Sequence, residues 1–92
     1  MAYGPTLTLK ASGSVTSDPA SIGAGLVVAH TFTATGAKTD NSLVVVNMPS
    51  LETNVCIVGA RVTAANTIEV RLYNPTGGAI NPASQEIRWA IF

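Results

Sequence analysis

Apolar residues in this sequence recur at every second position, and this spacing constrains the fold more than any other feature. In residues 67–73 (TIEVRLY), the side chains of Ile68, Val70 and Leu72 alternate with polar neighbours, and residues 86–91 (EIRWAI) repeat the pattern. Because successive side chains of a strand point to opposite faces of a sheet, the alternation places the apolar residues on one face. Both segments are therefore predicted to be strands with one face in the core.

Other segments also have the residue types of strands. Residues 26–35 and 55–63 are rich in Val, Ile, Phe and Thr, and residues 6–10 (TLTLK) fit a first strand. Residues 43–46 (LVVV) form a continuous apolar run, which favours a strand buried on both faces. Residues 12–25, by contrast, are rich in Ser, Gly and Ala and fit a loop or an irregular sheet edge.

Short breaks separate these segments. Pro49 cannot continue a central strand, because it has no N–H to donate. Residues 64–66 are short enough to form a hairpin turn, in which Asn66 tolerates the left-handed conformation that such turns need. No window combines a 3.6-residue apolar period with a cap and sufficient length for a helix. The sequence therefore predicts an all-β fold, either an antiparallel β-sandwich or a small jelly-roll-like barrel.

The 92 residues are expected to form a single domain, 1–92, in which residues 1–12 are either an N-terminal arm or an edge strand. Five basic residues balance five acidic ones, so no strong field attracts nucleic acid or an anionic membrane. Charged residues make up 11% of the chain, where about 25% is usual. A surface with so few charges promotes association, and we expect a homo-oligomer or a subunit of a larger assembly.

The sequence contains no convincing catalytic or metal-binding set of residues. The one histidine, His30, lies in a strand-like segment, and the one cysteine, Cys56, lies among apolar neighbours where a small buried residue is expected. One Cys and one His cannot supply the roughly four ligands of a zinc site. A ring of His30 side chains around a trimer axis is the remaining alternative for a metal. We therefore predict that the protein is not an enzyme and that it has no cofactor.

Charged residues on the two alternating strands are the first candidates for contacts with a partner. The polar faces of these strands carry Glu69, Arg71, Glu86 and Arg88, which would form cross-strand pairs if the two strands were neighbours. A solvated face is one interpretation of these residues. The other is that Arg61, Arg71 and Arg88 make contacts between subunits or with a docking partner, since Arg is favoured at interfaces.

The chain ends in an apolar run, residues 87–92 (IRWAIF). Alternation predicts that Ile87, Trp89 and Ile91 fill the core, so that the terminal strand ends without exposing them to water. Phe92 falls on the opposite face from Ile91 and becomes a candidate for a contact between subunits.

Several segments together resemble a small β-domain of virion proteins from tailed bacteriophages. These segments are DPASIGAG (18–25), TFTATGA (31–37), LVVV (43–46), GARVTAANTIEVRLYNPTGGAINPAS (59–84) and IRWAI (87–91). The resemblance covers residues 13–92, and its most specific part is TAANTIEVRL followed by INPAS. Residues 52–56 depart from the family pattern, which has a shorter Pro/Gly turn into the strand.

The resemblance implies a structural virion protein with no catalytic residues. It implies a capsid decoration (cement) protein, assembled in the host cytoplasm as a homotrimer. Such a protein binds the major capsid protein on the outer capsid surface and stabilises the head.

Two alternatives remain open at this stage. The first is a fibre or receptor-binding module that recognises a host-surface glycan, since similar domains occur in fibre-like proteins. Such a module needs exposed aromatic residues, and alternation places Phe32 and Trp89 in the core. The second is a small hydrolase, which the lack of a credible base disfavours.

Overall fold

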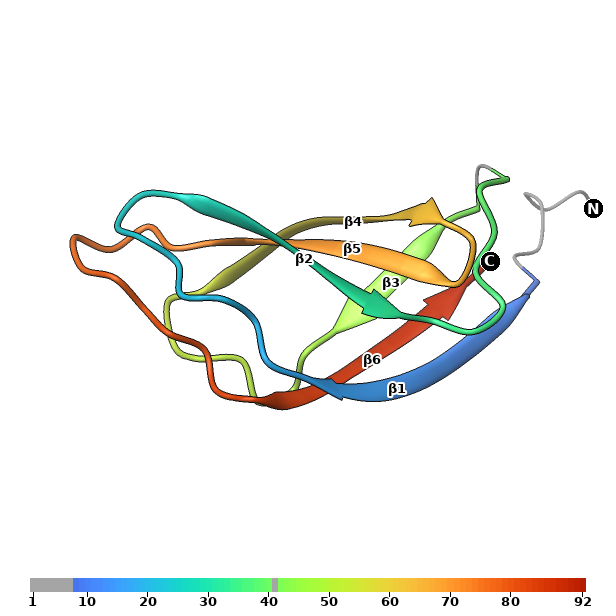
Figure 1. Ribbon diagram of the computed structural model, residues 1–92, viewed down its shortest axis with the longest axis horizontal. Coiled ribbons are helices and arrows are strands. Elements are labelled where there is room, and N and C mark those ends of the chain that lie inside the picture. The colour runs from blue at the N-terminus through green and yellow to red at the C-terminus, as the bar shows by residue number, and fades with distance from the viewer. Residues whose placement is uncertain (1–7, 41) are drawn as a thin grey trace, which may run out of the picture.

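A computed structural model of the chain describes residues 8–40 and 42–92, and within these residues it contains strands and no helix. The strands are β1 (Ala11–Ser17), β2 (Val27–Thr33), β3 (Val44–Asn47), β4 (Cys56–Ala64), β5 (Thr67–Tyr73) and β6 (Gln85–Ile91). They form two three-stranded antiparallel sheets, with strand orders β1-β6-β3 and β2-β5-β4 (Figure 1). The two sheets pack together as a small β-sandwich, which confirms the predicted all-β class.

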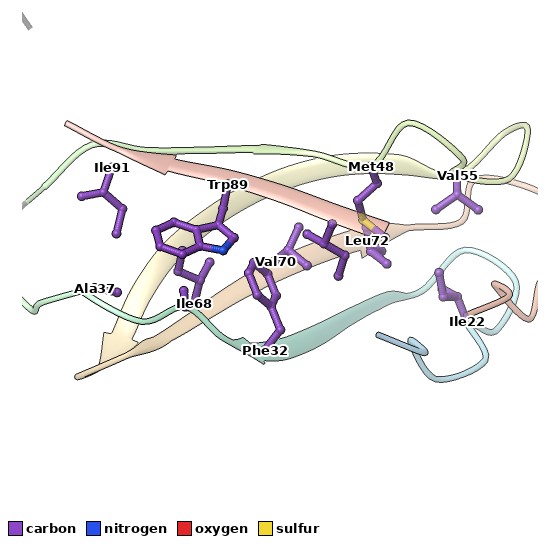
Figure 2. Packing of buried hydrophobic residues seen from close by; sticks show 12 residues of the cluster. Ile22, Phe32, Ala37, Met48, Val55, Ile68, Val70, Leu72, Trp89 and Ile91 are labelled. Carbon is purple, nitrogen blue, oxygen red and sulfur yellow. The ribbon is translucent and has the colours of Figure 1, made fainter. Parts of the chain in front are cut away.

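The core lies between the two central strands, β5 and β6. The three apolar residues of β5 are fully buried, and those of β6 are 0–6% exposed: Ile68, Val70, Leu72, Ile87, Trp89 and Ile91. Figure 2 shows the Trp89 ring extending toward Phe32 from the facing sheet, with Ile91 and Ile68 nearby. The prediction from alternation is therefore confirmed for both strands, and for Phe32.

The first strand lies later in the chain than predicted. Residues 6 and 7 lie outside the described residues, and residues 8–10 are not a strand, whereas β1 occupies residues 11–17 in the segment expected to be a loop or an irregular edge. Gly13 pairs with Trp89, and a Cβ at Gly13 would lie 3.0 Å from Cζ2 of the indole ring. The small residues of β1 therefore let this edge strand pass close to the large core side chain.

The apolar run at residues 43–46 is not buried on both faces, so that prediction was wrong. β3 is an edge strand of its sheet, paired on one side with β6. Val44 and Val46 turn toward the core, while Leu43 is 56% exposed and Val45 is 55% exposed. Among residues 8–40 and 42–92, no further layer covers the outer face of this strand.

The predicted hairpin at residues 64–66 joins β4 to β5. Asn66 has φ = 59°, in the left-handed region expected for it. Its N–H donates to the Ala37 carbonyl at 2.8 Å, and its side-chain Oδ1 accepts from the Gly36 N–H at 2.9 Å. Asn66 therefore ties the hairpin to the turn that follows β2.

Asn74 organises the opposite end of the sandwich, where the β1–β2 and β5–β6 connections lie (Figure 1). Its side chain is fully buried and donates to the carbonyls of Ile22 at 3.0 Å and Gly78 at 2.7 Å. Its Oδ1 accepts from the N–H and hydroxyl of Thr76. Asn74 therefore joins the two loops.

Across the residues that the structure describes, no helix is long and apolar enough to span a membrane.

Candidate interaction surfaces

The four predicted interface residues lie on two opposite outer faces of the sandwich. Arg61 and Arg71 project from β4 and β5 on the outer face of one sheet. Arg88 and Phe92 alternate with buried residues of the β6 segment and so project from the outer face of the other sheet. The structure therefore brings Arg61 and Arg71 together and separates both from Arg88 and Phe92.

Arg61 and Arg71 share one acidic partner. Arg61 stands directly across from Glu69 in the β4–β5 pair, and its Nε lies 3.4 Å from Oε1 of Glu69. Arg71, two residues along β5, donates from Nε to the same oxygen at 3.0 Å. The hydrogen bond from Arg71, together with both positive charges, lowers the pKa of Glu69 below its ordinary value. The two arginines thus favour the charged form of Glu69.

A groove opens beside this cluster. It has a volume of about 320 Å³ and is lined by Val58, Gly59, Ala60, Arg61, Glu69 and Arg71, which we call the arginine groove. Gly59 stands opposite Arg71, and no heavy atom lies within 4 Å of a Cβ built on it. The missing side chain on β4 therefore leaves the guanidinium of Arg71 accessible from that side.

The cross-strand charge pairs considered for β5 and β6 do not form, because the two strands belong to different sheets. Arg88 instead pairs within its own strand, with 2.6 Å between its Nε and Oε1 of Glu86. This pair is half exposed, and exposed ion pairs contribute little, about 0–1 kcal/mol. The sequence alone does not show which strands are neighbours, so it could not distinguish charge pairs between β5 and β6 from a pair within β6.

An apolar surface lies on the outer face of the β1-β6-β3 sheet, beside Arg88. It consists of Leu43, Val45, Ala90 and Phe92, which we call the Val45 surface. Val45 pairs with Ala90, and Leu43 exchanges two backbone hydrogen bonds with Phe92, of 2.9 and 3.0 Å. These pairings place all four side chains on one face. Phe92, expected at a subunit contact, therefore lies half-buried within a larger apolar surface.

Apolar side chains are also exposed on and beside the other sheet. Val27 is 51% exposed on β2, and Val58 is 54% exposed where β4 forms a bulge. Cys56 is exposed as well, which corrects the expectation that it is a small buried residue. It pairs with Tyr73 on the outer face of the sheet, at the start of an edge strand, so its apolar sequence neighbours do not enclose it.

His30 contacts Ser17 where β1 and β2 approach each other from the two sheets. The Oγ of Ser17 lies 2.7 Å from Nε2 of His30, and partial burial lowers the pKa of the imidazole. A hydrolase would use such a pair as nucleophile and base, but it also needs a third group that orients the imidazole. Within residues 8–40 and 42–92, no hydrogen bond to Nδ1 of His30 is recorded. The contact links the two sheets, and the negative charge of Asp18 also acts on the imidazole.

Potential metal ligands are dispersed. Among the described residues, no group of three or more His, Cys, Asp or Glu side chains lies close enough together to hold an ion.

Comparison of the chain with protein-family models, with curated proteins and with solved structures finds no match in any of the three.

Proposed function

We propose that this protein is a homotrimeric capsid decoration protein of a tailed bacteriophage, which binds the major capsid protein on the outside of the head and stabilises it. The observation that carries the proposal is the exposure of large apolar side chains on both outer faces of a sandwich that has few charges. Leu43, Val45 and Val58 are each more than half exposed. Contiguous exposed apolar surface of this kind marks sites of protein association.

The mechanism is burial of surface, with no chemical step. Each Å² of apolar surface removed from water contributes about 25 cal/mol, so even modest contacts repeated over many copies on a head accumulate. In the proposed trimer, the Val45 surface and the edge of β3 meet the neighbouring subunit. The opposite face, with the arginine groove, then remains available for the capsid.

The resemblance to phage virion domains supports the same function. Its most specific segment, TAANTIEVRL, spans the β4–β5 hairpin and most of β5, where Asn66 takes the left-handed turn position. INPAS lies in the connection that leads into β6. These two segments thus form the β4–β5 hairpin with most of β5 and the connection into β6.

The glycan-binding alternative receives less support. Sugar platforms need exposed aromatic rings, and Phe32 and Trp89 are each only 6% exposed. The other aromatic residues that the structure describes, Tyr73 and Phe92, are half-buried on opposite outer faces and do not form one platform. Tyr3 lies outside the described residues.

Binding to capsids tests the proposal. The purified protein is mixed with expanded, empty heads of the phage that encodes it, and bound protein is measured by cosedimentation. We expect binding that saturates at a fixed ratio to the major capsid protein and raises the temperature at which the heads disrupt. Absence of binding to expanded heads would contradict the proposal.

A further inference from the structure

We propose that the arginine groove binds the carboxylate of an Asp or Glu side chain presented by a partner protein. The groove lies on the outer face of the β2-β5-β4 sheet, where Arg61, Glu69 and Arg71 meet.

The first argument is the space beside Arg71. Its neighbour on β4 is Gly59 and its neighbour on β2 is Ala29, so small residues flank it on both sides. Together with the 320 Å³ groove, this arrangement lets a short acidic side chain reach the guanidinium from solvent.

The second argument is the set of unused donors. Each guanidinium has five N–H donors in a planar fork that matches a carboxylate. Both arginines engage Glu69 through Nε, and among the described residues no hydrogen-bond partner is recorded for their terminal nitrogens. The side chains of Arg61 and Arg71 are 65% and 51% exposed, so these donors face water.

The third argument is charge. Two guanidinium groups and one carboxylate leave the cluster with a net charge of +1, which a single carboxylate neutralises. A phosphate dianion would meet the Glu69 carboxylate with an excess of negative charge, so a carboxylate fits better. Arg88 provides a contrast, since its side chain is 60% exposed but its pair with Glu86 has no net charge.

This inference does not depend on the proposed function. If the protein decorates a capsid, the groove is where an acidic residue of the capsid surface docks.

Nuclear magnetic resonance of the Arg side-chain Nε–Hε groups tests the groove directly. A capped tripeptide with a central Glu is titrated into the whole protein, and the same peptide with a central Gln is the control. We expect saturable shifts at Arg61 and Arg71 with the Glu peptide, and no saturable shift at Arg88. The proposal would be overturned by equal chemical-shift changes at all three arginines, by no changes at all, or by equal changes with the Gln peptide. Saturation of these shifts by inorganic phosphate at a lower concentration than by the Glu peptide would overturn the assignment to a carboxylate.

A Gly59→Val variant provides the second test. Open space surrounds this position and its φ is outside the left-handed region, so the variant should fold and fill the groove. We expect an unchanged unfolding midpoint and loss of the saturable shift at Arg61 and Arg71. Retention of that shift in folded Gly59→Val would contradict the groove as the site. If the wild-type protein binds the peptide but not the heads, the proposed function fails and the groove stands.

Discussion

Trp89 is the residue on which the core depends most. Its ring is 6% exposed and extends toward Phe32 of the facing sheet (Figure 2). A Cβ built on Gly13 of β1 would lie only 3.0 Å from the ring. The sequence contains no other tryptophan, and no neighbouring side chain is large enough to fill the volume of an indole.

Trp89→Ala should therefore destabilise the fold by about 3–5 kcal/mol, the range for removing a large aromatic from a core. Denaturant unfolding at equilibrium measures the change. Thr33→Ala, at an exposed position on the other sheet, is the control and should change stability by no more than about 0.5 kcal/mol. A similar small change for both variants would show that the core does not depend on Trp89.

The two Asn-Pro pairs allow a second comparison at single residues. Asn74→Ala removes buried hydrogen bonds that join two loops, and each contributes about 0.5–1.5 kcal/mol, while the Ile22 carbonyl keeps its bond from the Ile80 N–H. Asn81 also precedes a proline but is exposed. We expect the unfolding temperature to fall by several degrees in Asn74→Ala and to stay unchanged in Asn81→Ala. Equal effects of the two substitutions would refute the role of Asn74.

At the scale of elements, the alternation of β5 and β6 was sufficient to predict both strands and their core faces. β3 was misjudged because a run of four apolar residues has the same pattern in a buried strand and in a short edge strand. β1 was predicted only as a loop or an irregular edge because Ala and Gly have low strand propensity. Its pairing with β6 and its passage beside Trp89 impose the extended conformation.

The candidate interfaces could be predicted only in part, because they depend on how the strands pair. Residue type identified Arg61 and Arg71, but their convergence on Glu69 depends on the β4–β5 register, which includes two irregularities. The Val45 surface depends on β3 pairing with β6 through residues separated by about half of the chain. Neither the register nor the pairing can be derived from local spacing.

Glu52 links two connections, and this link predicts a pH dependence. Its carboxylate accepts from the Ala83 N–H at 2.9 Å and from the Gln85 side chain at 3.0 Å, and the bond from Ala83 lowers the pKa of Glu52. Because the folded-state pKa is below the unfolded value, the stabilisation is present above the unfolded pKa and is lost as the pH falls through the folded one.

Glu52→Gln should therefore lower the unfolding temperature at pH 7, since its amide N–H₂ faces that of Gln85. The difference from wild type should disappear in acid, where Glu52 of the wild type is itself protonated. Thermal melts across the acidic range measure it, with Glu86→Gln as the control on an exposed ion pair. A difference that is independent of pH would contradict this role of the carboxylate.

At the scale of the whole molecule, the two outer faces differ in chemistry. One carries the apolar Val45 surface and the other carries the arginine groove. Such a difference suits a subunit that contacts its own copies on one side and a different protein on the other.

Val45→Lys should reduce the proposed trimer to single chains, because burying an ammonium group in an apolar contact carries a large desolvation cost. Light scattering gives the mass of the assembly, and circular dichroism should show that each chain keeps its fold, because Val45 is exposed within one chain. Thr33→Lys, exposed on the other sheet, is the control and should remain trimeric. A wild-type protein with the mass of one chain would contradict the homotrimer, and a trimeric Val45→Lys would exclude the Val45 surface as the contact.

The location of the protein in the virion tests the central claim most directly. Purified, intact virions are labelled with antibodies against this chain and viewed by immuno-electron microscopy. If the protein decorates the capsid, the label should be distributed over the outer surface of the head. Label confined to the tail or fibres, or virions that carry no label, would contradict the claim.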